Sequence, residues 1–325
     1  MASRARVMVL VGLAAAGAAG ATVGITLATS TSVPKRTVSR PGAPPLVLDL
    51  GVRTDPEAQA LRRAARLYDK GKRAQAAPIF ARYSSLEARV GAALAAWPAG
   101  RERIVSLARE NPKSGIVQLE LGLAQYWTGE TARARAAWRR TKRVAPDSLY
   151  GIRASDLLHP DLPIPGLPQF VPSFAPPAEL QKLTPARQLE RLRADARSGG
   201  ARAKILYGVA LQRLDRPVSA EREFAAAAAA APSDPEAQAA AAVGLFDKDA
   251  PARAFGRLGP LAGTFPHAVT VRFHLGLLLL WLGQVDQAKK QLELARSDSP
   301  SSALGHQAQL LLVRLANVRT KRLGR

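Results

Sequence analysis

The chain has 325 residues, no cysteine and a formal net charge of +22, from 47 Lys and Arg residues against 25 Asp and Glu residues. The absence of cysteine excludes a disulfide framework, a thiolate metal site and a cysteine nucleophile. One hydrophobic core rarely organises so long a chain, so we expect two domains or a repeat array, and the 47% hydrophobic content excludes a mainly disordered protein.

The first predicted element is an apolar segment at residues 7–28, which contains no charged residue and follows a short basic flank. Its 22 residues exceed the ~20 needed to cross a bilayer as a helix. We therefore predict a signal anchor or transmembrane helix over residues 1–28, with the rest of this single-pass protein outside the cytoplasm. The alternative is a cleaved signal peptide and a secreted protein, because Ala19 and Ala21 fit an Ala-x-Ala cleavage site.

A linker follows at residues 29–56, where Pro34, Pro41, Pro44 and Pro45 occur among Ser, Thr and basic residues. Such a composition is typical of an extended, flexible tether. We expect this linker to connect the membrane helix to the folded part of the chain without packing against it.

A repeat with a period of 34 residues extends over the remaining chain. In three units a glycine precedes a proline by 24 residues: Gly122 and Pro146, Gly208 and Pro232, and Gly276 and Pro300. A small residue lies 12 residues after each glycine and a large apolar residue four residues further on: Ala134 and Trp138, Ala220 and Phe224, and Ala288 and Leu292.

This pattern predicts that each unit forms a helix, a turn, a second helix and another turn. The glycine would lie inside the first helix, where it costs ~1 kcal/mol relative to alanine. That cost is acceptable if the missing side chain lets the second helix approach closely. The proline ends the second helix, because it cannot continue it.

The units resemble the tetratricopeptide repeat family, most closely from Leu121 to Pro146 and from Leu275 to Pro300. The resemblance implies an all-α fold: a tetratricopeptide-like helical-hairpin solenoid, wound as a right-handed superhelix, here with an N-terminal transmembrane helix. It also implies that the first helix of each unit lines a concave groove in which partners bind.

The expected segments are N-terminal helical repeats at 57–158, a proline-rich insertion at 159–184, C-terminal helical repeats at 185–300, and a capping helix with a basic tail at 301–325. The helix at 149–158 and the helix beginning at Pro185 are expected to form one repeat, split by the insertion. The insertion carries the apolar residues Leu162, Ile164, Leu167, Phe170, Val171 and Phe174. We predict that it folds into the groove and occupies it.

No catalytic constellation is found, because the four histidines form no HExxH pair and neither GxxxxGK[ST] nor GxSxG occurs. We therefore expect a protein that is not an enzyme and needs no cofactor or metal. The hypothetical partner-binding residues on the first helices are Tyr126, Trp127, Arg202, Arg213, Phe273, Leu277 and Trp281. The alternative for Trp127 and Trp281 is packing between helices.

Six basic residues and no acid occur between Thr131 and Val144: Arg133, Arg135, Arg139, Arg140, Lys142 and Arg143. This stripe is a hypothetical site for an anionic polymer or an acidic lipid surface, and its alternative is an ordinary solvated helix face. No nucleic acid partner is expected, because the export signal places the repeats outside the cytoplasm.

The sequence thus predicts a membrane-tethered, extracytoplasmic scaffold that mediates protein–protein interaction through an apolar concave groove. The alternative is a basic adaptor for an anionic polymer or lipid. A third possibility is a non-catalytic accessory of a cell-wall enzyme.

Overall fold

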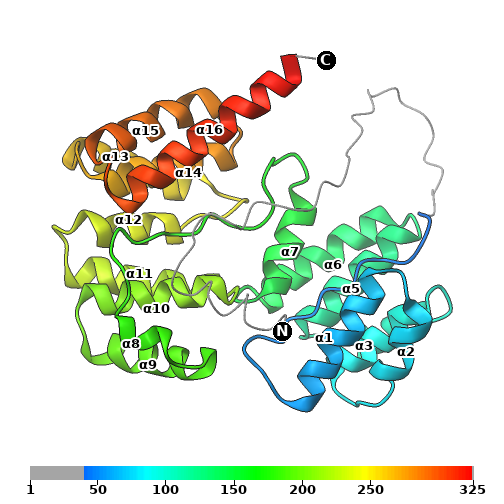
Figure 1. Ribbon diagram of the computed structural model, residues 1–325. Helices are drawn as coiled ribbons and strands as arrows, with labels where there is room; N and C mark the ends of the chain where they lie inside the picture. Colours follow the sequence, from blue (N-terminus) through cyan, green and yellow to red (C-terminus); the bar gives the residue numbers. More distant parts are fainter. Residues whose placement is uncertain (1–39, 324–325) are drawn as a thin grey trace. The chain divides into compact units, whose positions relative to one another are not determined.

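The computed structural model describes residues 40–323, which contain sixteen α-helices and no strand (Figure 1). This part of the chain divides into two compact units at the boundary between Pro146 and Asp147. Within residues 40–323 no helix is both long and apolar enough to span a membrane. The predicted anchor at residues 1–28 lies outside the described range.

The N-terminal unit comprises α1 (Pro56–Asp69), α2 (Arg73–Phe80), α3 (Leu86–Ala95), α4 (Arg101–Glu110), α5 (Gly115–Trp127) and α6 (Thr131–Val144). Consecutive helices pack as hairpins, and the first helices α1, α3 and α5 contact one another in turn. The helix starts follow from local chemistry: Asp55 caps α1 by accepting the Ala58 N–H, and Ser85 caps α3 in the same way.

The C-terminal unit comprises α7 (Leu149–Leu158), α8 (Ala178–Gln181), α9 (Pro185–Ser198), α10 (Ala201–Arg213), α11 (Pro217–Ala230), α12 (Pro235–Gly244), α13 (Ala252–Thr264), α14 (Val269–Trp281), α15 (Val285–Asp298) and α16 (Ala303–Leu323). Three hairpins, α10–α11, α12–α13 and α14–α15, place their first helices side by side. The last helix, α16, packs against α14 and α15.

The glycines of the repeat allow the close helix crossing that their spacing predicts. A Cβ added at Gly208 would lie 2.5 Å from Cε1 of Phe224, and one added at Gly276 would lie 2.9 Å from Cγ of Leu292. The large apolar residue of the second helix therefore rests directly on the glycine of the first. Only glycine leaves room for it.

The turn between the two helices needs a left-handed backbone at one equivalent position in four hairpins, and in α1–α2 Gly71 adopts it with a φ of 74°. Gly129 has a φ of 82° and Gly283 a φ of 72°, whereas Asp215 adopts a φ of 58° with a full side chain. The α10–α11 hairpin thus places an L-residue where glycine fits without strain.

The expected split repeat is wrong. Among the described residues α9 packs against α10 and α8, with no comparable packing against α7 (Figure 1). Instead Asp156 of α7 pairs with Lys248, and Asp147, which lies just before α7, accepts hydrogen bonds from Ser219 of α11. Sequence spacing identified both helices correctly, but it does not specify which neighbour buries each apolar face.

Candidate functional site

The first helices of the C-terminal hairpins form a face that carries an extended segment of the same chain. We call the face formed by α10, α12 and α14 the C-terminal A-helix face, and residues 164–174 the C-terminal strap. Figure 1 shows the strap in green, leaving the loop after α7, running along α12 and turning towards α8. The insertion packs onto the repeats through buried apolar residues and hydrogen bonds, and its predicted occupation of a groove stays a prediction.

Main-chain N–H groups of the strap donate to side chains from three successive first helices. Phe170 N donates to Oε1 of Gln212 on α10 at 2.9 Å, and Val171 N donates to Nε2 of His274 on α14 at 2.9 Å. On α12, the Glu236 carboxylate accepts the N–H and the hydroxyl of Ser173, at 2.6 and 2.8 Å. One side chain from each first helix therefore recognises the extended backbone.

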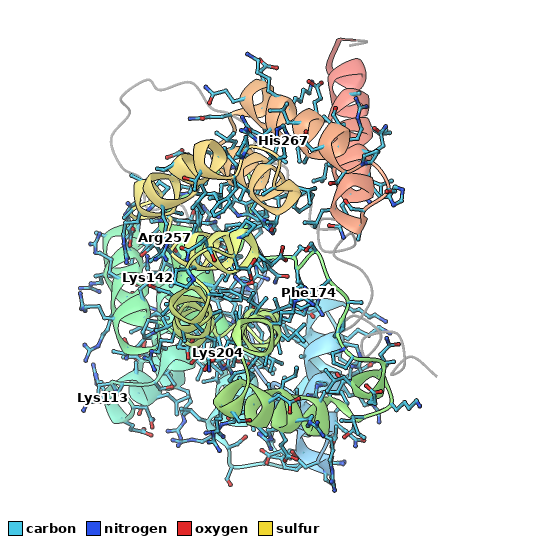
Figure 2. The ribbon with its side chains drawn as sticks, turned by 90° about the vertical axis from the view of Figure 1, so that its left-hand side faces the viewer. Lys113, Lys142, Phe174, Lys204, Arg257 and His267 are labelled. Carbon is cyan, nitrogen blue, oxygen red and sulfur yellow. The ribbon has the colours of Figure 1, made fainter. Side chains whose placement is uncertain are left out.

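Aromatic side chains anchor the strap between these bonds. The Phe170 ring is only 1% exposed, stacks on the His274 ring at 4.4 Å and meets Phe224 edge-on at 5.7 Å. Phe174, labelled in Figure 2, lies 5.1 Å from the Arg202 guanidinium, within cation–π range. The strap thus combines a buried aromatic anchor with a second aromatic ring beneath a cation.

His274 holds the strap as a neutral imidazole. Because Val171 N is a donor, Nε2 of His274 must accept, and Nδ1 then donates to the Thr270 carbonyl at 2.6 Å. Complete burial lowers the pKa of His274 to about 4. Burial also raises the pKa of Glu236, although the hydrogen bonds from Ser173 oppose that shift.

The start of the strap is fixed by a buried ion pair. The Lys248 ammonium, whose side chain is 1% exposed, lies 2.6 Å from Asp156 and donates to the Ile164 carbonyl at 3.0 Å. Asp156 also accepts the Gly166 N–H at 2.9 Å, and Trp281 Nε1 donates to the Gly166 carbonyl at 3.4 Å. These contacts set where the extended chain enters the face.

The N-terminal unit carries a second strap at residues 40–50, which we call the N-terminal strap. Leu46 and Leu50 are buried, and the Tyr68 hydroxyl donates to the Pro44 carbonyl at 2.5 Å. The expectation of a non-packing linker is therefore wrong for residues 40–50. The spaced leucines bury apolar area that outweighs the composition-based preference for a free tether.

On α5 the N-terminal strap meets a buried carboxyl group. Val47 N donates to Oε1 of Glu120 at 2.8 Å, and burial raises the pKa of Glu120 to about 8. At its other end, Arg40 N donates to the Trp127 carbonyl at 2.9 Å, and its guanidinium lies 3.7 Å from the Tyr126 ring centroid. The two straps thus share one mode of attachment, from strap N–H to a buried side-chain acceptor.

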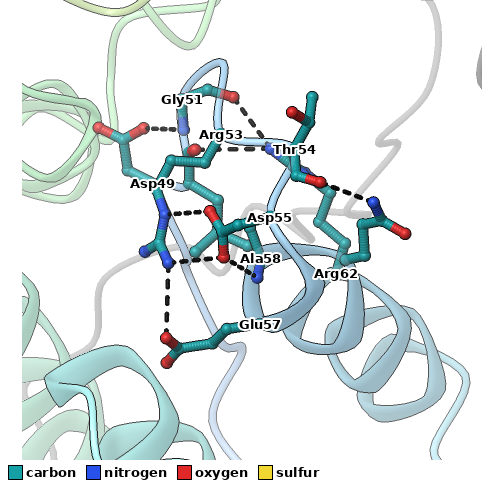
Figure 3. Close-up of polar contacts among 10 residues, drawn as sticks. Asp49, Gly51, Arg53, Thr54, Asp55, Glu57, Ala58 and Arg62 are labelled. Carbon is teal, nitrogen blue, oxygen red and sulfur yellow. Dashed lines mark hydrogen bonds and ion pairs between the residues drawn. The ribbon is translucent and has the colours of Figure 1, made fainter.

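Between the N-terminal strap and α1, a polar cluster fixes the direction of the chain (Figure 3). Arg53 donates to both carboxylate oxygens of Asp55, at 2.9 and 3.0 Å, while Asp55 caps α1. The Arg53 hydrogen bond is the main reason that the pKa of Asp55 falls to about 2. Arg62 from α1 donates back to the Gly51 carbonyl at 3.1 Å.

The predicted partner-binding residues divide between strap contacts and core packing. Two of them, Tyr126 and Trp127, contact the N-terminal strap. Two others, Arg202 and Trp281, contact the C-terminal strap. Phe273 is buried, and Leu277 packs beside it in a cluster shared with α15 and α16. Arg213 is half-buried, and desolvation lowers its pKa. Whether any of them binds a partner stays a prediction.

The predicted basic stripe lies on α6. Arg133, Arg135, Arg139, Arg140 and Arg143 are exposed, whereas Lys142 is half-exposed. Arg133 pairs with Glu130 at 2.6 Å. Figure 2 shows Lys142 and Lys113 along one edge of the N-terminal unit.

Sequence reasoning missed Glu120, Glu236 and His274 as the side chains that hold the straps. A signal existed for Glu120, because it is the only charged residue in α5. A lone carboxyl group in an apolar helix requires a hydrogen-bond partner, and the Val47 N–H supplies one. Glu236 gives no such signal, because a glutamate in the first turn of α12 is also favoured by the helix dipole.

Comparison with known proteins supports the repeat assignment. A family model described as tetratricopeptide repeat matches residues 117–148 and 270–302. No curated protein matches the chain.

Several solved structures are similar to the chain at low identity and with low TM-scores. YrrB, described as a TPR protein with an unusual peptide-binding site, is 14% identical with a TM-score of 0.31, over 64% of this chain and 98% of its own. The TPR2AB domain of yeast Sti1 is 10% identical with a TM-score of 0.28, over 80% and 98%. Yeast Tom70 is 10% identical with a TM-score of 0.30, over 87% and 68%.

The two matched segments coincide with the hairpins α5–α6 and α14–α15, in which the glycine, alanine and proline spacing is most regular. Residues 117–148 and 270–302 therefore match the tetratricopeptide repeat, as their spacing predicts, and lie within a described range, residues 40–323, that contains helices and no strand.

Proposed function

We propose that this chain is a membrane-tethered scaffold that holds extended segments of a partner protein outside the cytoplasm. The observation that supports it most strongly is the C-terminal strap on its A-helix face. Three side chains on this face accept hydrogen bonds from the main-chain N–H groups of an extended segment: Gln212, Glu236 and His274. The proposal includes no catalytic role.

The location rests on the apolar run at residues 7–28. Its test is fractionation of cells that express the full chain. The proposal predicts that the protein stays with the membrane after a high-salt wash and is digested by protease added outside the cytoplasmic membrane. Release by salt, or protection from external protease, would contradict it.

Partner binding can be tested by site-specific photo-crosslinking in cells. A photoreactive residue would replace Trp127 or Trp281, which lie beside the two straps. The matched control is Leu294 on α15, which is 42% exposed and away from the strap contacts described above. The proposal predicts discrete adducts heavier than the chain from the two tryptophan positions only. Equal adduct patterns from all three positions would contradict it.

A basic adaptor is a second candidate, favoured by the exposed arginines of α6. It predicts that the chain binds polyphosphate, used as a model polyanion, with an affinity that falls steeply with salt. Replacing Arg135, Arg139 and Arg140 by Gln should weaken binding. The matched control replaces three exposed arginines of α9, Arg187, Arg193 and Arg197. Equal losses from both sets would assign the effect to net charge and exclude a specific stripe.

A further inference from the structure

The C-terminal strap is attached to its face by side chains. Between residues 164–174 and the helices of the described chain, no hydrogen bond joins main chain to main chain. Its main-chain donors instead meet the side chains of Asp156, Gln212, His274 and Glu236. Removing the strap would therefore leave the helical hydrogen bonds of the hairpins intact.

The prolines of the strap match this mode of attachment. Pro168 and Pro172 carry no N–H, so they leave no donor to satisfy on either side of the bonded pair Phe170 and Val171. Prolines also favour an extended backbone before binding, which lowers the entropy lost on attachment. The strap has the properties of a peptide ligand that happens to be covalently connected to its receptor.

Three features of the face specify the chemistry of such a ligand. The rings of His274 and Phe224 both contact the Phe170 ring, and this arrangement favours an aromatic side chain at that position. The acceptors on α10 and α14 require main-chain donors from two adjacent residues, and the acceptor on α12 requires one from the residue two positions further on. The Glu236 carboxylate requires an N–H and a hydroxyl from one residue, here Ser173, and would repel an acidic side chain there.

We infer that the C-terminal A-helix face is a binding site for an extended partner segment of the pattern aromatic, apolar, Pro, Ser or Thr, and that the strap is its internal competitor. The inference rests on the proposed function. It adds the sequence pattern of the bound segment and the regulation of binding by the strap. A tethered ligand acts at an effective concentration of roughly millimolar. A partner must therefore outcompete the strap, and any change that weakens the strap raises affinity for the partner.

The experiment uses the full chain and a fluorescein-labelled synthetic peptide with the sequence of residues 164–176, followed by fluorescence anisotropy. The Phe170→Ala and Ser173→Asp variants of the chain should each bind the peptide at least about tenfold more tightly than wild type, because each weakens the strap. Leu46→Ala, a truncation in the N-terminal strap, is the matched control and should leave the affinity unchanged.

The same substitution in the peptide should act in the opposite direction. A peptide that carries Asp at the position of Ser173 should lose binding to the Phe170→Ala chain, because its carboxylate faces Glu236. This reversal separates competition at the face from a general loosening of the protein.

Three results would overturn the inference. One is equal peptide affinity for wild type and both variants while circular dichroism shows full helicity. Another is a loss of helicity in both variants, which would make the strap part of the fold. A third is a wild-type dimer that exchanges straps, which would make a second copy the occupant. Crosslinking from Trp127 could still succeed in each case, so the proposed function would be judged separately.

Discussion

The two units hold their straps with different chemistry at the same place in the repeat. Glu120 lies two residues before Gly122, and His274 lies two residues before Gly276. Each side chain is fully buried and accepts a main-chain N–H from its strap. Burial raises the pKa of Glu120 to about 8 and lowers the pKa of His274 to about 4.

The same position, two residues before the glycine of the repeat, can therefore make the attachment of a strap depend on pH in opposite directions. Burial favours the neutral form in both cases. A carboxyl group is neutral when protonated, whereas an imidazole is neutral when deprotonated. Ionisation strengthens the hydrogen bond from Val47 to Glu120, but the cost of burying the charge is larger. The N-terminal strap should therefore be weakened by base and the C-terminal strap by acid.

The largest expected effect is at Glu120. Below pH 4.5 the group is protonated whether the unit is folded or unfolded; as the pH rises towards about 8, ionisation favours the unfolded form. Glu120 therefore contributes to the free energy of unfolding below pH 4.5. As the pH rises to about 8, up to about 5 kcal/mol of this contribution is lost. Glu120→Gln keeps an acceptor for Val47 but cannot ionise. Calorimetry at pH 5 and pH 8 should show a drop in one thermal transition of wild type that is absent in the variant.

His274 should give a smaller effect of opposite sign. Above pH 6.5 the imidazole is neutral in both states, and as the pH falls towards about 4 the unfolded form takes up the proton first. The stability lost over this range is up to about 3 kcal/mol. His274→Gln should remove this dependence, as measured by calorimetry at pH 7 and pH 4.5. An unchanged slope in the variant would assign the acid sensitivity to other groups.

The glycine crossings offer a third comparison between the units. A Cβ at Gly122 would lie 2.5 Å from Cδ1 of the rigid Trp138 ring, whereas one at Gly276 would meet the flexible Leu292 at 2.9 Å. Replacement by alanine should destabilise both, by about 1–3 kcal/mol, with Gly122→Ala the more severe. The free energy of unfolding of both alanine variants can be measured by urea unfolding followed by circular dichroism. The reverse order would mean that helix shifts, rather than side-chain rigidity, absorb the clash.

The smallest expected effect concerns the left-handed turn. Asp215 has a φ of 58° at the position that Gly129 and Gly283 occupy in two other hairpins. Asp215→Gly should raise the thermal midpoint slightly, with a gain below about 1 kcal/mol. The reverse substitution in another hairpin, Gly283→Asp, should lower the thermal midpoint. A loss of stability in Asp215→Gly would show that the contacts of the aspartate outweigh its backbone strain.

The sequence predicts the hairpins because their spacing is set by local geometry. Gly208 and Phe224 recur at a fixed distance, since one helix must approach the other at one place. The packing of the insertion was predicted from its length and apolar residues, and Phe170 is indeed buried in the core of the C-terminal unit. The first expectation depends on residue size and repeat period, and the second depends on the composition of the insertion.

What the sequence does not predict is pairing over long distances. Nothing local connects Val47 to Glu120, which are 73 residues apart, or Val171 to His274, which are 103 residues apart. Proline-rich segments were expected to be a free tether at 29–56 and an occupant of the repeats at 159–184. Residues 40–50 do not form a free tether, because Leu46 and Leu50 are buried against the N-terminal unit.

The most direct test of the two-strap account is hydrogen exchange of the full chain over a range of pH. The protection factors of the Val47 and Val171 amides, corrected for intrinsic exchange, report each strap separately. The account predicts that protection of Val47 falls between pH 6 and pH 9 and that protection of Val171 falls between pH 6 and pH 4. Parallel changes at the two amides, or no protection at either, would contradict it.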